Sequence, residues 1–195
     1  MGNQTSLSFA EFPLASQLHN PVVLISDSFV SKTSTTLTYQ GHDLIARGKS
    51  ELTMRGVKDN ALSNRRLEYI DKRSNQAVAN MKANVVFAGN STERPRAMVK
   101  PHPINRTIEI VLAGHKRLLL RANTTQAVLL LENSIHGYIP VAHFTRNDSW
   151  SVTIAAGVDT TLGAVAMTSL IDMLRWSPPN LSPRHFCSVN RAASI

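Results

Sequence analysis

Seven basic side chains between residues 94 and 121 are the groups in this sequence best suited to bind a ligand. Glu109 is the one acidic residue in the same stretch, which therefore carries a large excess of positive charge. Guanidinium and ammonium groups donate hydrogen bonds to phosphate and carboxylate oxygens. The stretch predicts either an ordinary solvated face or a binding patch for an anion. The seven residues are Arg94, Arg96, Lys100, Arg106, Lys116, Arg117 and Arg121.

The kind of anion follows from what the stretch lacks. No aromatic residue lies between Arg94 and Arg121, whereas proteins that bind single-stranded nucleic acid stack bases on aromatic side chains. Lipid head groups rich in phosphate need only charge and hydrogen-bond donors, so acidic phospholipid is favoured over nucleic acid. In a strand, Arg117 and Arg121 share one face and Lys116 points to the other. The candidate lipid-binding residues are Lys100, Arg106, Lys116, Arg117 and Arg121.

The first six residues, Met1 to Ser6, match the pattern for N-terminal myristoylation. Gly2 would be the acceptor, because the acyl group is attached to an unhindered α-amine exposed when the initiator Met is removed. A single myristoyl chain gives a membrane affinity of only about 10⁴ M⁻¹, so a second signal is needed. The positive charge of the chain would supply that signal near an acidic leaflet.

Two pairs of residues suggest catalysis or metal binding, and each has a simpler explanation. His136 and His143 could meet across a hairpin, but their odd spacing places them on opposite faces of a continuous strand. Asp71 and Glu132 could act as acid and base, but acidic residues at such positions commonly bond their own turn. We interpret the histidines as surface residues and the acids as turn residues.

Known catalytic motifs are missing from the sequence. It contains no Gly-x-Ser-x-Gly, no phosphate-binding loop, no His-Glu-x-x-His and no pair of cysteines. Arg184 and His185 could lower the pKa of the single cysteine, Cys187, but a second catalytic partner is not apparent. We therefore expect a protein that is not an enzyme and that uses no cofactor or metal.

Composition places the chain in a broad class. The 195 residues are enough for one domain with tails, and the net charge of +8 favours acidic partners. One cysteine excludes a disulfide framework, and the N-terminus lacks the apolar run of a secretory signal. We expect a cytoplasmic monomer that is peripheral at membranes.

A helix over 160–174 is the element around which the rest of the chain must be arranged. Apolar residues occupy every side of its helical wheel, and Asp159 is positioned to cap its first turn. Such a helix must be buried on all sides, and it is too short for a membrane span of about 20 residues. Pro178 and Pro179 end it.

Most of the remaining chain reads as strands with period-2 alternation or short apolar runs. One face of the 76–87 segment is expected to bury Ala77, Ala79 and Met81, with Asn80 on the other face, and 89–103 is expected to be a polar loop. Many short strands around one buried helix predict a closed antiparallel barrel, which has no exposed edge. The expected strands are 22–25, 28–40, 44–47, 67–71, 76–87, 107–112, 116–121, 126–131, 137–144 and 150–156.

Two segments echo each other and suggest similar halves. Residues 67–81 and 128–144 both run from an apolar strand through an acidic residue and a polar turn into a second apolar strand. A single echo is weak support for a duplication.

The C-terminal part resembles the LURP-one-related family, which is related to the tubby C-terminal domain and the phospholipid scramblases. The resemblance rests on SVTIAAGVDTTLGAVAMTSLIDML, with Gly157, Asp159 and Asp172, and on the acid-turn-strand pattern at Asp71 and Glu132. It covers roughly residues 22–176. It implies a barrel of about twelve strands around a hydrophobic C-terminal helix, with no active site.

The same resemblance sets the expected domain organisation and function. Tubby relatives bind phosphoinositide head groups through basic side chains, but those positions do not align with particular residues of this chain. The sequence also has Asn75, and His136 with Gly137, where the family usually has an Asp-x-x-Gly turn. We expect a flexible segment over 1–21, a barrel over 22–176 and a disordered tail over 177–195.

Three functions remain open at this point. The first is a peripheral membrane module that recognises acidic phospholipids such as phosphoinositides. The second is a regulatory barrel that binds a protein partner and whose charge is incidental. The third and weakest is a scramblase-like lipid mover, because that activity would need a membrane-inserted element.

Overall fold

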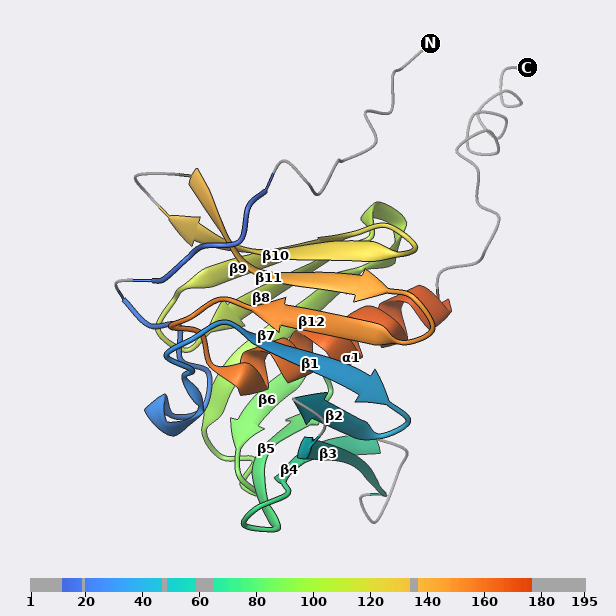
Figure 1. Ribbon diagram of the computed structural model, residues 1–195. Helices are drawn as coiled ribbons and strands as arrows, with labels where there is room; N and C mark the ends of the chain where they lie inside the picture. The colour runs from blue at the N-terminus through green and yellow to red at the C-terminus, as the bar shows by residue number, and fades with distance from the viewer. Residues whose placement is uncertain (1–11, 19, 47–48, 59–64, 134–136, 177–195) are drawn as a thin grey trace, which may run out of the picture.

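The chain folds into a closed antiparallel barrel of twelve strands around one long helix, α1 (Figure 1). The computed structural model describes residues 12–18, 20–46, 49–58, 65–133 and 137–176. Each strand pairs with its neighbours in sequence, and β1 closes the barrel against β12. The predicted fold class, mainly β with a central helix, is confirmed.

The strands are mostly short, as expected for a meander that closes on itself. Two 3-10 helices, η2 (Asp27–Phe29) and η3 (Pro103–Asn105), precede β1 and β8. The strands are β1 (Thr35–Gln40), β2 (Asp43–Ala46), β3 (Lys49–Lys58), β4 (Arg65–Asp71), β5 (Gln76–Lys82), β6 (Val85–Ala88), β7 (Pro95–His102), β8 (Thr107–Leu112), β9 (Arg117–Ala122), β10 (Gln126–Asn133), β11 (Gly137–Arg146) and β12 (Trp150–Ile154).

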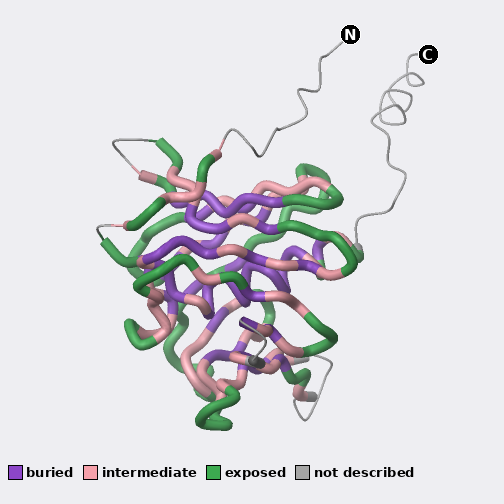
Figure 2. Tube along the Cα trace, viewed as in Figure 1, coloured by how far each residue is buried: buried purple, intermediate pink, exposed green. Residues whose placement is uncertain are grey.

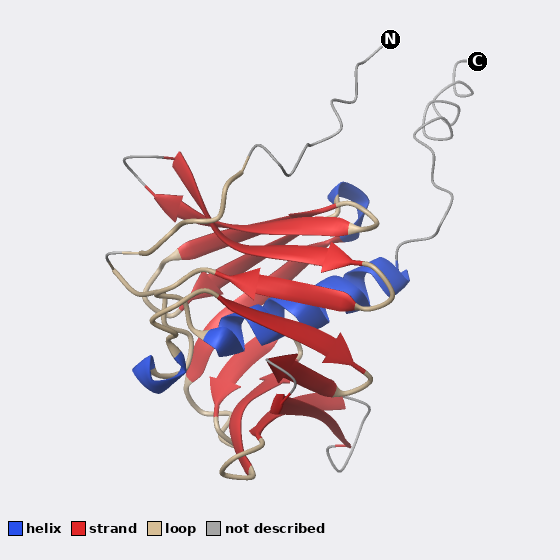
Figure 3. Cartoon of the chain, viewed as in Figure 1, coloured by secondary structure: helices blue, strands red, loops and turns tan. Residues whose placement is uncertain are grey.

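Helix α1 (Thr160–Trp176) runs through the barrel, where the strands surround it (Figure 3). Leu162, Val165 and Leu170 are fully buried, and the burial map shows the core as a continuous band along the helix and strands (Figure 2). The helix comes so close to β12 that a Cβ on Gly163 would lie 2.3 Å from Ile154 Cδ1. A side chain larger than hydrogen at this position would force the side chain of Ile154 to move.

Asp159 caps α1 as the sequence predicts, and it also holds a second segment. Its Oδ1 accepts from the backbone N–H of Thr161 at 2.8 Å. Its Oδ2 accepts from the N–H groups of Leu24 at 3.0 Å and Ile25 at 2.8 Å. Residues 22–25, expected to be a strand, therefore form only a single bridge, from Val22 to Val158, because the side chain of Asp159 takes the place of a strand partner.

Two strands were missed by the sequence prediction. β7 lies within the expected loop over 89–103, and β3 lies in a stretch for which no strand was predicted. In β7, Ala97 and Val99 point into the core while the residues between them are exposed. The exposed Met98 makes three apolar residues in a row, which hides this alternation from a hydrophobicity pattern.

The predicted second arm of the 67–87 hairpin is two strands and not one. Ala83 and Asn84 adopt positive φ values of 48° and 66°, so the chain reverses between β5 and β6. Asn80, expected on the face opposite Ala79 and Met81, is fully buried. Its Nδ2 donates to the carbonyls of Gly89 at 2.7 Å and Ser91 at 2.9 Å, which satisfies both N–H groups of the amide, whereas Oδ1 is buried without a hydrogen-bond partner among the described residues.

The described part of the N-terminal segment, expected to be a flexible tether, contacts the outside of the barrel. The N–H of Ala15 donates to the Pro140 carbonyl at 3.0 Å, and that of Leu18 donates to the Ala156 carbonyl at 3.3 Å. Phe12 covers a small apolar cluster of Val128 and Leu130, which face outward from β10. The packed part of the chain therefore begins at least as early as residue 12.

Candidate functional site

The outward side chains of β7, β8 and β9 form a regular surface, here called the β7–β9 face. Strand register places Glu109 of β8 between Lys100 of β7 and Leu119 of β9. In the next row Val111 lies between Met98 and Arg117. The residues between them, such as Val99, Ile110 and Leu118, are buried in the core. The nine residues of this face are Met98, Lys100, His102, Thr107, Glu109, Val111, Arg117, Leu119 and Arg121.

The charges on this face are predominantly positive. Glu109 lies between two cations, with its carboxylate 3.7 Å from Lys100 Nζ and 3.9 Å from Arg117 Nε. All three side chains are at least partly exposed, so these ion pairs are weak and readily exchanged for other partners. One carboxylate between two cations leaves positive charge available to an incoming anion.

Arg121 extends this face toward β11. Its guanidinium carbon lies 5.8 Å from the centre of the Tyr138 ring, within the range of a cation–π contact. Such a contact positions the guanidinium without using its hydrogen-bond donors. Arg117 and Arg121 share the outer face of β9, which agrees with the alternation expected from the sequence.

The other two candidate residues lie at opposite ends of this face. Arg106 follows η3 with left-handed backbone angles (φ 51°, ψ 44°), at the end of β8 where Arg121 lies. Lys116 lies in the β8–β9 turn, where its Nζ donates to the Pro21 carbonyl at 3.1 Å. The five predicted residues therefore divide into three on the face and one at each end.

Exposed apolar side chains accompany these cations, and the sequence analysis named none of them. In the described part of the chain the large apolar residues that are exposed are Met98 (47%), Ile104 (94%) and Tyr138 (46%). Met98 belongs to the β7–β9 face, Ile104 projects from η3 between β7 and β8, and Tyr138 contacts Arg121. A lone isoleucine among polar turn residues, in His-Pro-Ile-Asn-Arg, was the signal available in the sequence.

The two acids considered for catalysis lie far apart. Asp71 ends β4 and Glu132 lies near the end of β10, six strands away around a barrel of twelve. Asp71 accepts from Ser74 Oγ at 2.7 Å, Ser74 N at 3.1 Å and Arg73 N at 3.3 Å. Partial burial raises the pKa of Asp71, but these hydrogen bonds outweigh it and hold the pKa below its ordinary value. Asp71 is thus a turn residue, as the sequence indicates.

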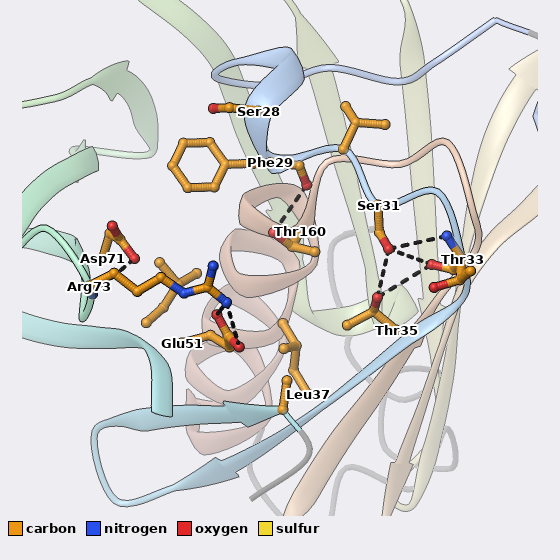
Figure 4. A pocket seen from close by; sticks show the side chains of 13 residues that line it. Ser28, Phe29, Ser31, Thr33, Thr35, Leu37, Glu51, Asp71, Arg73 and Thr160 are labelled. Atoms are coloured by element: carbon orange, nitrogen blue, oxygen red, sulfur yellow. Dashed lines mark hydrogen bonds and ion pairs between the residues drawn. The ribbon is translucent and has the colours of Figure 1, made fainter. Parts of the chain in front are cut away.

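A cavity of about 510 Å³ opens where α1 begins, and it holds no catalytic arrangement (Figure 4). Its hydroxyl groups bond within the protein, since Thr35 Oγ1 donates to Ser31 Oγ at 3.0 Å and Ser31 Oγ donates to the Thr33 carbonyl at 2.6 Å. Arg73 Nη2 lies 3.3 Å from Glu51 Oε2 at the rim. Among the residues that the structure describes, neither a histidine nor a cysteine lines this cavity.

Histidines and acids do not form a metal site in the part of the chain that the structure describes. His143 lies on β11 with its Nε2 buried, whereas His136, Cys187 and the predicted acceptor Gly2 lie outside the described residues. No helix within the described ranges is both long and apolar enough to cross a bilayer.

Comparison with known proteins gives no match to this chain among family models, curated proteins or solved structures. The LURP-one-related resemblance therefore stays a prediction from the sequence.

Proposed function

We propose that this protein is a non-enzymatic, peripheral membrane-binding module that recognises acidic phospholipids through the β7–β9 face. The observation that carries this proposal is that exposed cations and exposed large apolar side chains occur together on one side of the barrel. Lys100, Arg117 and Arg121 supply the positive charge, while Ile104 and Tyr138 supply apolar contact. Surfaces of this mixed kind suit the interface between head groups and acyl chains.

The energetics support attachment that is reversible. Each basic residue near an acidic leaflet contributes roughly 1 kcal/mol, and salt weakens this attraction within a Debye length of about 10 Å. Tyrosine side chains favour the membrane interface because the ring is apolar and the hydroxyl remains hydrated. We propose that acylation of Gly2 supplies a further anchor, which intact-mass measurement of the protein from eukaryotic cells would detect.

Charge reversal on the β7–β9 face tests the proposal. The double variant Arg117→Glu, Arg121→Glu should reduce co-sedimentation with vesicles containing phosphatidylserine or phosphoinositide by about tenfold or more at low salt. Its melting temperature should stay near that of the wild type, because Arg117 is exposed and neither residue is in the core. A matched control, Lys32→Glu with Lys72→Glu, makes the same change of charge on the far side of the barrel.

The outcomes separate this function from the alternatives. Equal loss in the control variant would show that net charge, and not this face, attracts the vesicles. Unchanged binding in the face variant at low salt would contradict the proposal and leave a protein partner as the better explanation. Lipid movement between leaflets is the weakest alternative, and no observation on the described residues favours it.

A further inference from the structure

Helix α1 does not lie equally close to all the strands of the barrel. Its backbone comes closest to β12, β7 and η3, whereas larger side chains such as Leu37, Leu52 and Tyr69 lie between the helix and strands β1 to β4. Two cavities lie on that side of the helix, the one of about 510 Å³ beside the start of α1 and another of about 480 Å³ beside its last turns. The same strands line both, with Leu37 and Leu52 in the first and Tyr39 and Met54 in the second. The two cavities thus lie beside the same strands, one near each end of α1.

Tyr69 on β4 separates these two cavities. Its side chain is fully buried, and a hydrogen bond of 2.6 Å joins its hydroxyl to Thr168 Oγ1 on α1. Burial raises the pKa of Tyr69 well above its ordinary value, so the hydroxyl stays neutral. Leu67 and Asp71 lie on either side of Tyr69 in the chain, and each lines a different cavity.

The cavity beside the last turns of α1, here called the C-terminal cavity, has an apolar wall. The wall is made by Tyr39, Met54, Leu67, Met81 and Ile171. The residues contributed by α1 are Thr168, Ile171, Asp172 and Arg175, whose spacing places them on one side of the helix. The cavity therefore runs along the helix for about two turns and is long enough for an extended chain.

The polar residues of the C-terminal cavity are predominantly basic. His42, Arg66 and Arg175 contribute to the lining, against a single acid, Asp172. Arg66 Nη2 lies 2.7 Å from the buried carboxylate of Glu68, which also binds Arg55 at 2.6 Å. Arg55 and Glu68 alternate along β3 and β4 with the lining residues Gly56 and Leu67, so this ion-pair cluster lies behind the cavity wall and adds one net positive charge there.

The opposite cavity has the reverse balance. Glu51 and Asp71 line it together with one cation, Arg73. An acidic ligand would be repelled there and attracted to the C-terminal cavity, although the two have similar volumes.

We propose that the C-terminal cavity binds a single-chain amphiphile with an acidic head group, such as a fatty acid or an acidic lysophospholipid. The apolar wall accepts the chain, and the basic residues at the rim accept the head group. Its volume lies within the range of small-molecule sites, roughly 300–1,000 Å³. This site is separate from the β7–β9 face, so the inference does not depend on the proposed membrane function.

Gly56 offers a way to block the cavity without disturbing the fold. It lines the cavity and continues the inward alternation of Leu52 and Met54 along β3, opposite Leu67. A Cβ on Gly56 would meet no atom within 4 Å. Gly56 is exposed, so the leucine side chain of Gly56→Leu should obstruct the opening of the cavity while the barrel folds normally, and Gly56→Ala is the control for the backbone change.

Isothermal titration calorimetry with monomeric decanoate, and separately with decanoyl lysophosphatidic acid, tests the site. Gly56→Leu should weaken binding of both ligands by about tenfold or more, whereas Gly56→Ala should change it by less than about threefold. Arg175→Gln should weaken decanoate binding by about threefold, and Asp172→Asn should strengthen it, with decanol unaffected by either. Whichever of the two acids binds more tightly identifies the preferred head group.

Several results would overturn this proposal. One is that the wild type gives no heat of binding with either acid. Another is that Gly56→Leu folds and binds both acids with unchanged affinity. The third is that Arg175→Gln weakens the binding of decanoate and of decanol equally. Arg175 is exposed, so Arg175→Gln should fold normally. Its effects on decanoate and decanol therefore test the proposal even if Gly56→Leu folds poorly. Vesicle binding through the β7–β9 face should be unaltered by Gly56→Leu, which distinguishes failure of this proposal from failure of the proposed function.

Discussion

Asp159 shows how one side chain can carry more than its local motif predicts. The sequence identifies it as a helix cap, and its Oδ1 fills that role. The contact of Oδ2 with the N–H groups of Leu24 and Ile25 joins residues that are 134 and 135 positions apart. No local pattern could reveal this second contact, because it depends on how the N-terminal segment crosses the end of the barrel.

Replacement of Asp159 should therefore cost more than loss of an ordinary cap. Asp159→Ala would leave three buried or partly buried N–H groups without an acceptor, and we expect a loss of about 3 kcal/mol in the free energy of unfolding. Urea denaturation followed by circular dichroism would measure it. Asp159→Asn, which keeps one acceptor oxygen, should lower the free energy of unfolding by less. A decrease under about 1 kcal/mol for Asp159→Ala would contradict the view that this side chain holds both the helix and the N-terminal segment.

Tyr69 gives a prediction for alkaline pH. Burial is the main cause of its raised pKa, which lies above the value of about 10 expected in the unfolded chain. As the pH rises, Tyr69 therefore loses its proton in the unfolded chain before it does so in the folded protein. The contribution of the Tyr69 hydroxyl to the free energy of unfolding is complete below about pH 10 and decreases as the pH rises further. Tyr69→Phe should cost about 1 kcal/mol at pH 7 through the lost hydrogen bond and should decline less steeply above pH 10. Parallel slopes in the two proteins would contradict this account.

At the scale of elements, helix α1 was predictable because its composition leaves no alternative. An uncharged, apolar stretch after a capping residue must be a buried helix, and the structure places it at Thr160–Trp176 against the expected 160–174. Strand β12 was equally clear, since Trp150, Val152 and Ile154 alternate with polar residues. Both elements have strong local periodicity.

Strand β7 and the β5–β6 turn were not predictable for the opposite reason. In β7 the core face consists of Ala97 and Val99, and the exposed Met98 lies between them, so three apolar residues in a row hide the alternation. In β5, Asn80 is buried because its Nδ2 donates to a loop that only the folded chain brings near. These features are set by tertiary contacts, which override local preference.

The helix is buried from Thr161 to Leu170 and exposed at Asp172 and Arg175, and the burial of the first part can be tested with one substitution. Leu170 is fully buried, so Leu170→Asp would place a carboxylate in the core without a partner. We expect a loss of at least about 4 kcal/mol, enough to unfold many domains of this size. Thermal melting would show it, with Asp172→Asn on the exposed side as the control. A melting temperature within a few degrees of the wild type would contradict a central helix.

At the scale of the whole molecule, the two echoing segments occupy equivalent places. Residues 67–81 lie in the β4–β5 hairpin and 128–144 in the β10–β11 hairpin, which are six strands apart around the barrel. Each hairpin carries a register shift, between Tyr69 and Ile70 in the first and between Leu129 and Leu130 in the second. The two hairpins thus share their position relative to each other around the barrel and an irregular register, while the first lines the cavities beside α1 and the second pairs with the basic strand β9.

The candidate site could be predicted only in part. The excess of basic residues was visible in the sequence, and alternation correctly placed Arg117 and Arg121 on one face. Lys116 and Arg106 lie away from these two residues because the β8–β9 turn and the end of η3 fix their positions. Ile104 is exposed because it belongs to η3. A hydrophobicity pattern cannot distinguish an exposed isoleucine from a buried one.

Ile104 decides how the whole barrel would approach a membrane. With 94% of its surface exposed, at the tip of the β7–β8 turn, it contributes almost nothing to the core. Ile104→Asn should therefore leave the melting temperature unchanged but weaken binding to acidic vesicles by about fivefold, the effect of losing about 1 kcal/mol of apolar contact. Ile104→Leu, the matched control, should bind like the wild type.

Salt distinguishes the apolar contact from the charged one. Because an apolar contact is not screened by ions, the loss of vesicle binding in Ile104→Asn should persist at high salt, whereas the loss in the Arg117 and Arg121 variant should shrink. Wild-type binding by Ile104→Asn would mean that this turn points away from the bilayer.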